Sequence, residues 1–118
     1  MAKIQTLEQF QKTFGVEPVE VTLEEFGKDA TTFFLKPLKS ADRDNFEASV
    51  VGIDGNRNLL NLRARLVSLA WCDAEGKPIG SAKQIGELRS DLVNALFDRV
   101  RVLNGMETED EIAEAGKD

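Results

Sequence analysis

Two stretches in the second half of this chain carry apolar residues at three- and four-residue spacing, and this periodicity limits the fold more than any other feature of the sequence. Such spacing places the apolar side chains on one face of an α-helix. The first stretch predicts a helix over about 57–71, and its apolar face is formed by Leu59, Leu62, Leu66 and Leu69. The second predicts a helix over 91–104, and its stripe is formed by Leu92, Leu96, Val100 and Leu103.

Capping and turn residues mark the ends of these two helices. Ser90 suits the N-cap of the last helix, and Asn104-Gly105 is a strong stop signal. The end of the helix predicted over 57–71 has two interpretations, helix or strand. Residues 67–71 would also suit a buried strand, and periodicity over so few positions does not decide between the two. We favour helix through residue 71.

Three shorter helices are predicted from their first residues. Thr6 and Ser81 each stand three positions before a glutamine, which is the capping-box pattern that satisfies free amides at a helix start. Ser40 is a suitable N-cap residue with an acidic residue in the turn that follows. The predicted helices are 6–14, ended by Gly15 in the left-handed conformation, 41–51 and 82–88.

The segment between the predicted helices 6–14 and 41–51 has the pattern of β-structure. Val19, Val21 and Leu23 alternate with polar residues, and residues 30–36 are rich in β-branched and aromatic side chains. These features predict a β-hairpin within 16–37. The expected fold is therefore mostly α with a small N-terminal β-hairpin, an α+β arrangement in one compact domain.

Charge separates a body from a tail. The 118 residues carry 21 acidic and 15 basic side chains, a net charge of −6. Six of the acids and one of the bases lie beyond residue 106, so the remainder is almost neutral. We expect residues 1–106 to form the single folded domain and residues 107–118 to form an acidic, flexible C-terminal tail.

The chemical inventory gives no support for an enzyme. The chain has no histidine and one cysteine, which excludes Ser-His-Asp and Cys-His catalysis, His-ligated metal sites and an internal disulfide. Cys72 is expected to be a buried hydrophobe. Asp73 and Glu75 fit a turn better than a cation loop. We expect no catalytic residue, no metal and no cofactor.

Composition also limits the partners. A nucleic-acid binder needs a basic excess, and the near-neutral body lacks one, so we expect no nucleic-acid partner. The apolar runs are far shorter than the ~20 residues of a membrane span, and the N-terminus has no hydrophobic signal core. We therefore expect a cytoplasmic protein without membrane contact.

Three features of the sequence are suited to binding another protein. One is the apolar helix stripe itself, which would bind an amphipathic client helix if part of it were uncovered. Trp71, the single tryptophan, is either a core anchor or an interface anchor. Arginines occur on the two long predicted helices, and they are either solvated ion pairs or a surface for the acidic tail of a neighbouring subunit. A head-to-tail contact of that kind builds a ring or an open spiral. The charged candidates are Arg57, Arg63, Arg65, Arg99, Arg101, Glu109, Asp110 and Glu111.

The order of segments resembles a known family, the tail assembly chaperones of long-tailed, non-contractile, lambda-like bacteriophages. The similarity covers most of the chain and is spread over helix and turn positions. One departure is Gly80-Ser81, where an aromatic residue would be expected to open the next helix. The segments that carry the resemblance are Val19-Glu20-Val21, Phe33-Phe34-Leu35-Lys36-Pro37-Leu38, Ser40-Ala41-Asp42-Arg43, Leu62-Arg63-Ala64-Arg65-Leu66-Val67-Ser68-Leu69, Asp73-Ala74-Glu75-Gly76-Lys77-Pro78-Ile79 and Leu103-Asn104-Gly105.

The resemblance implies a mostly helical, non-enzymatic protein that self-associates and coats the tape measure protein before the tail tube polymerises. It implies recruitment of the major tail protein, a location in the cytoplasm of the infected bacterium, and absence from the mature virion. It also implies a short form of a chain that has a frameshift-extended partner, and codons for Ala115-Gly116-Lys117 can contain a slip site.

Two other readings compete with this one. An acidic protein-binding inhibitor that imitates DNA would need carboxylates spread over the folded surface, whereas here they crowd the tail. A generic adaptor module is the second. Both are non-enzymatic.

Overall fold

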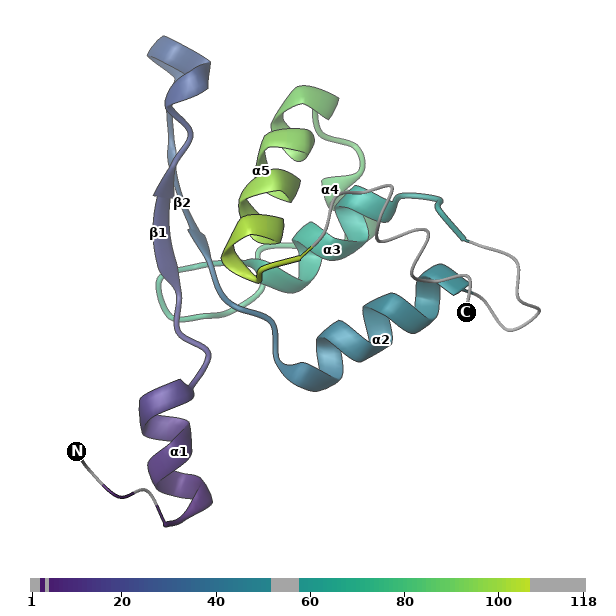
Figure 1. Cartoon of the computed structure of the whole chain (residues 1–118). Coiled ribbons are helices and arrows are strands. Elements are labelled where there is room, and N and C mark those ends of the chain that lie inside the picture. The colour runs from purple at the N-terminus through teal and green to yellow at the C-terminus, as the bar shows by residue number, and fades with distance from the viewer. Residues whose placement is uncertain (1–2, 4, 52–57, 107–118) are drawn as a thin grey trace.

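The computed structural model describes residues 3, 5–51 and 58–106 (Figure 1). These residues form a single compact domain in which helices predominate over a small antiparallel sheet, as the sequence predicts. Arg57 and the C-terminal tail, 107–118, lie outside the described residues, so the predicted boundary at residue 106 stays a prediction. The elements in order are α1 (Leu7–Phe14), β1 (Val19–Thr22), the 3-10 helix η1 (Glu24–Asp29), β2 (Thr32–Leu35), α2 (Ser40–Val51), α3 (Leu62–Ala70), β3 (Trp71–Cys72), α4 (Ala82–Ile85) and α5 (Ser90–Leu103).

The predicted hairpin is confirmed and gains a third strand. β1 and β2 pair antiparallel with Val19 opposite Leu35, and β2 pairs antiparallel with β3 with Leu35 opposite Trp71. Helix through residue 71 was therefore the wrong choice by one residue, because the chain passes from α3 directly into β3. The Lys36 amide donates to the Ala70 carbonyl at 2.9 Å, so pairing with β2 ends the helix where periodicity alone would continue it.

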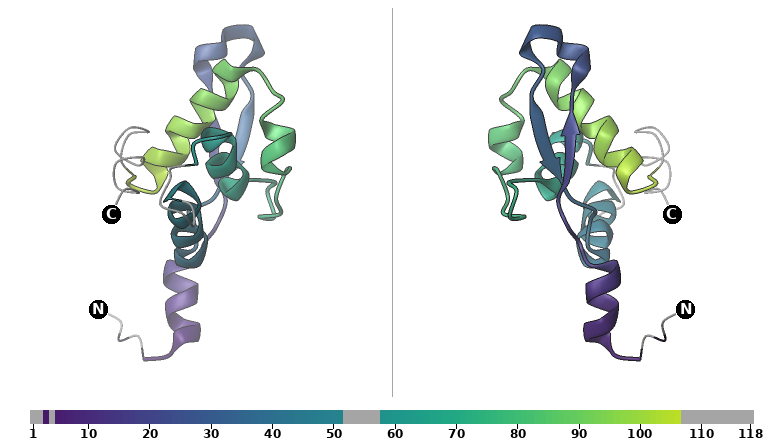
Figure 2. Two further views of the ribbon diagram at one scale, coloured as in Figure 1. Left: turned by 90° about the vertical axis from the view of Figure 1, so that its right-hand side faces the viewer. Right: turned by 90° about the vertical axis from the view of Figure 1, so that its left-hand side faces the viewer.

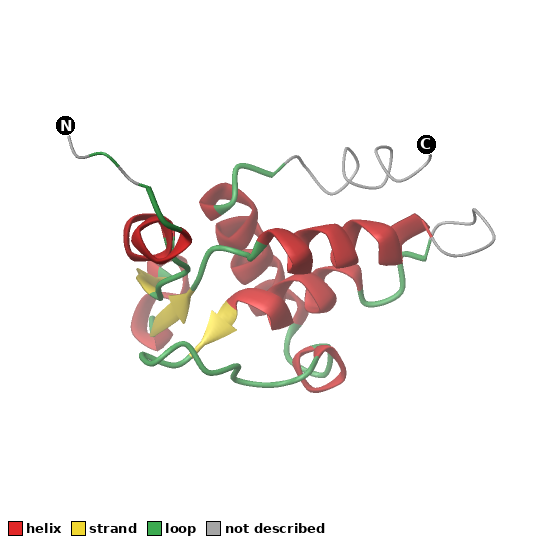
Figure 3. Cartoon of the chain, turned by 90° about the horizontal axis from the view of Figure 1, so that it is seen from below, coloured by secondary structure: helices red, strands yellow, loops and turns green. Residues whose placement is uncertain are grey.

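The central helix α3 holds the core together. Leu66 and Val67 are fully buried, and α3 packs against α5 and α4 and more lightly against α2. Figure 3 shows α2, α3 and α5 gathered on one side of the sheet. The stripe of α5 faces the same core, with Leu96 and Val100 fully buried. The leucine and valine spacing thus predicted the buried faces of both long helices, except at Leu59, which precedes α3 and is exposed.

Several predicted helix ends differ from those in the structure. Helix 57–71 begins only at Leu62, because Asn61 before it has a left-handed backbone with φ 54°. Helix 82–88 ends at Ile85. Ser90 is the first helical residue of α5 instead of its N-cap, which is Arg89 and has no side-chain cap bond. Gly15 ends α1 in an extended conformation, with φ −69° and ψ 164°, and not in the left-handed one.

The predicted stop at Asn104-Gly105 is confirmed. Gly105 has φ 60°, which lets the chain reverse after α5. The Met106 amide donates to the Arg101 carbonyl at 2.8 Å and the Gly105 amide to the Val102 carbonyl at 3.2 Å. This pair of bonds is a Schellman motif, and buried Met106 supplies its hydrophobic contact.

Asn104 connects the end of α5 to the linker between β2 and α2. Its side-chain oxygen accepts a hydrogen bond from the Leu38 amide at 2.8 Å, and its side-chain nitrogen donates to the Val100 carbonyl at 2.9 Å. Arg43 Nη1 also donates to the Asn104 carbonyl at 3.3 Å. The end of α5 is therefore joined at one residue to the linker before α2 and to the first turns of α2, which lie more than 60 positions earlier in the sequence.

We expect Asn104→Ala to lower the free energy of unfolding by about 1–3 kcal/mol, because the part-buried Leu38 amide loses its acceptor. Urea unfolding followed by circular dichroism would measure the change. Asn94→Ala, on the exposed face of the same helix, is the matched control and should leave the stability nearly unchanged or slightly raised. Equal stability of the two variants would show that the Leu38 bond contributes nothing.

Candidate partner-binding surface

The first candidate surface is the apolar face of α1. The capping box predicted at Thr6 is present: Gln9 donates its amide to Thr6 Oγ1 at 3.2 Å, and its side-chain oxygen accepts from the Thr6 amide at 3.1 Å. No residue of this helix is buried. Leu7 and Phe14 remain 74% and 72% exposed, and Phe10 is 46% exposed. Figure 1 shows α1 projecting from the body below the hairpin.

The exposed apolar stripe of α1 is unusual for a helix of this length. An isolated helix of eight residues is marginal in water, and most helices are stabilised by packing of their apolar face. The Phe10 and Phe14 rings stack on each other with centroids 6.1 Å apart, which leaves most of their surface in water. The stripe formed by Leu7, Phe10 and Phe14 is therefore a surface suited to burial against another molecule.

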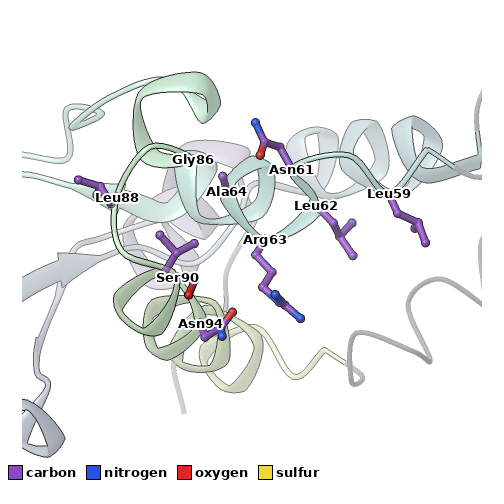
Figure 4. Close-up of a pocket in the computed structure, with 10 residues that line it drawn as sticks. Leu59, Asn61, Leu62, Arg63, Ala64, Gly86, Leu88, Ser90 and Asn94 are labelled. Carbon is purple, nitrogen blue, oxygen red and sulfur yellow. The ribbon is translucent and has the colours of Figure 1, made fainter.

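The second candidate surface is a depression between the N-terminal parts of α3 and α5. It has a volume of about 260 Å³ and is open to solvent. Its lining mixes apolar residues, among them buried Leu62 and Val93 and partly exposed Leu59 and Leu88, with the polar side chains of Asn61, Arg63, Ser90 and Asn94 (Figure 4). The exposed part of this lining is more polar than apolar.

Arg65 is placed differently from the sequence expectation of an exposed arginine face. It is half-buried and points toward α2, where Nη1 donates to Ser49 Oγ at 3.0 Å. Its Nη2 donates to the carbonyl of Asn58, which precedes α3. Its Nε is buried and has no hydrogen-bond partner among the described residues. Burial lowers the pKa of this guanidinium, because desolvation disfavours the charged form. Arg65 therefore joins α3 to the end of α2.

The other described arginines also contact different elements. Arg63 is exposed and lines the depression. Arg99 pairs with Glu25 of η1 at 3.0 Å, and Arg101 pairs with Asp98 one turn earlier at 3.3 Å. The pKa of Glu25 is lowered by a hydrogen bond from its own backbone amide and by Arg99. The structure does not bring these arginines together on one face, and Arg57, Glu109, Asp110 and Glu111 lie outside the described residues.

Trp71 and Cys72 both contribute to the sheet. Trp71 is half-buried and meets Phe33 edge to face, with ring centroids 5.5 Å apart. Cys72 is buried, as predicted, and burial raises the pKa of its thiol. The Asp73 carboxylate accepts hydrogen bonds from the amides of Glu75 and Lys77, both at 2.9 Å, which lowers its pKa and confirms the predicted turn.

Neither candidate surface was singled out from the sequence. The sequence predicted the helix over 6–14 and offered an uncovered helix stripe as a binding feature, but it did not indicate that this helix would carry it. The available signal was the short extended link of residues 15–18 after the helix, which contains Gly15 and Pro18. The depression depends on how α3 and α5 pack, and no local pattern records that packing.

The described residues provide neither a cluster of metal ligands nor a helix able to span a membrane. Within 3, 5–51 and 58–106, no group of three or more cysteine and acidic side chains is placed to hold a metal ion. In the same ranges, every helix is too short or too polar to cross a membrane.

Comparison with protein-family models, with curated proteins and with solved structures gave no significant match for this chain.

Proposed function

We propose that this protein is the short form of a phage tail assembly chaperone. It self-associates and coats the tape measure protein in the cytoplasm of the infected bacterium. It recruits the major tail protein, works beside a frameshift-extended form of itself, and does not remain in the virion. The proposal rests on the sequence resemblance, and the observation that supports it best is the uncovered apolar stripe of Leu7, Phe10 and Phe14 on α1.

The physical requirements of such a chaperone agree with this surface. A long amphipathic client aggregates through its exposed apolar stripes unless another molecule covers them. A small subunit with an exposed apolar helix can cover such stripes by repetition along the client. Many weak contacts then add up through avidity, while each remains weak enough to be displaced when the tube assembles.

Co-expression with the tape measure protein of the same phage tests the proposal. The parent chain is expected to keep the tape measure protein in the soluble fraction and to co-purify with it. Phe10→Asp should reduce the soluble amount several-fold, because a carboxylate on the stripe opposes burial of that face. Lys12→Asp, which places a carboxylate on the opposite face of α1, is the control. A tape measure protein that stays insoluble with the parent chain would contradict the proposed function.

A further inference from the structure

We propose that the outer edge of β1 binds an extended segment of a partner protein in which basic and apolar residues alternate. The segment would pair with β1 and add a strand to the sheet. This inference goes beyond the proposed function and does not rest on it, because it assigns a different surface from the stripe of α1. It follows from the backbone groups of β1, from its side chains and from the charge around them.

The outer edge of β1 is left unpaired by the fold. The strand order is β1-β2-β3, so β1 and β3 form the two edges of the sheet. The outer side of β3 is already paired, because Cys72 forms a bridge with Pro78 and the Ile79 amide donates to the Trp71 carbonyl at 3.2 Å. Among the described residues, only β2 pairs with β1. An edge of this kind offers its backbone to another extended chain.

The pairing register shows which backbone groups of β1 point outward. In an antiparallel ladder, the N–H and C=O groups of successive residues alternate between the two sides of a strand. The Leu23 amide donates to the Thr31 carbonyl at 3.4 Å, so the backbone groups of Val21, two positions earlier, also face β2. Those of Glu20 and Thr22 therefore point away from β2. Each of these two residues offers one donor and one acceptor to an added strand.

The side chains of β1 predict the pattern of the added segment. Val19 lies opposite fully buried Leu35, so it is on the face of the sheet that packs on the helices, and Val21 shares that face. Val19 is 42% exposed there, so an apolar side chain beside it would extend the covered surface. The right-hand view of Figure 2 shows the hairpin in front of the helices, which leave its other face uncovered. Glu20 is exposed on that face, next to the side chain of any residue that pairs with it.

The charge near β1 favours a basic segment. Glu17, Glu20 and Glu24 are exposed and lie in β1 or within two positions of its ends. Glu25 is paired with Arg99, but no basic residue occurs from position 13 to 27 to offset the other three acids. A second copy of β1 would bring the same acids to the contact, and like charges across a strand pair are destabilising. Charge complementarity therefore favours a basic partner over a second copy of this chain.

The length of the edge limits the size of the segment and the strength of the contact. β1 has four residues, and Pro18 before it has no amide hydrogen to donate. η1 begins at Glu24, two positions after the strand ends. The added strand is therefore about four to six residues long, and its binding is expected to be weak and to depend on salt.

A synthetic hexapeptide of alternating lysine and valine, blocked at both ends, tests the assignment. NMR of the full chain would follow the exchange of individual backbone amide hydrogens with water as the peptide is added. At saturation, exchange of the Glu20 and Thr22 amides should slow about tenfold or more, because both hydrogens become bonded. The matching glutamate–valine hexapeptide should give no such protection. Raising the salt to about 0.5 M should weaken binding of the lysine–valine peptide.

Two variants separate backbone pairing from charge. Thr22→Pro removes an outward N–H and leaves the backbone bonds from β1 to β2 in place, so it should weaken binding about five- to tenfold. Glu20→Lys changes only an exposed side chain, and it should reverse the preference so that the glutamate–valine peptide binds better. Glu87→Lys makes the same change of charge at an exposed position after α4 and should bind like the parent.

Three outcomes would overturn the assignment. In the first, the lysine–valine peptide fails to slow exchange at the Glu20 and Thr22 amides of the parent. In the second, Glu20→Lys keeps the parental preference. In the third, the same two amides become protected as the concentration of the chain alone is raised, which would place a second copy at this edge. None of these results bears on the coating of the client, which is tested separately through the stripe of α1.

Discussion

Arg65→Glu is expected to lower the free energy of unfolding by about 2–4 kcal/mol. The substitution removes the hydrogen bonds from the guanidinium to Ser49 and to the Asn58 carbonyl. It also places a carboxylate against backbone carbonyl oxygens in a half-buried position, where neither group can donate to the other. Because a change of this size shifts Tm by about 4 °C per kcal/mol in a small domain, a loss of about 8–16 °C should be seen in a thermal melt.

Arg63→Glu is the matched control for this prediction. It makes the same change of charge on the same helix, two residues away, at an exposed position. Its stability should stay within about 1 kcal/mol of the parent. If the two variants melt at the same temperature, Arg65 does not support the contact between α2 and α3.

Leu66→Ala is expected to cost about 3–4 kcal/mol. Leu66 is fully buried on α3, the helix that packs against α5, α4 and α2, so truncation leaves a cavity at the centre of the domain. Urea unfolding should show a lower midpoint with an unchanged dependence on denaturant, because the same surface is exposed on unfolding.

Leu60→Ala provides the comparison for the core variant. Leu60 stands just before α3 and is 80% exposed, so the same truncation removes little buried area. A change within about 0.5 kcal/mol is expected. A Leu66→Ala variant as stable as Leu60→Ala would mean that the domain does not depend on the packing of α3.

Local signals predicted the elements of this fold better than its surfaces. The capping boxes at Thr6 and Ser81 and the stop at Asn104-Gly105 depend on neighbouring residues, and all three are present in the structure. Helix was favoured over the alternative strand at Trp71, because the pairing of β3 with β2 is non-local. A two-residue strand has no periodicity of its own to detect.

The position of Arg65 shows why candidate site residues were harder to predict. At about 100° per residue, Arg63 lies about 60° beyond Leu66 and Arg65 about 40° beyond Leu69, so they stand at opposite borders of the stripe. The two arginines therefore face different surroundings, although they are only two positions apart in the sequence. Which border of the stripe is covered depends on α2, and that packing is a property of the whole fold.

The bond between Leu38 and Asn104 has a consequence for synthesis on the ribosome. It joins residues 66 positions apart, so the connection between the hairpin and α2 has no acceptor until the last helix has emerged. Contacts of such long range slow folding, because the loop between them must close first. The arrangement of the hairpin against α2 is therefore completed only after Asn104 has left the ribosome.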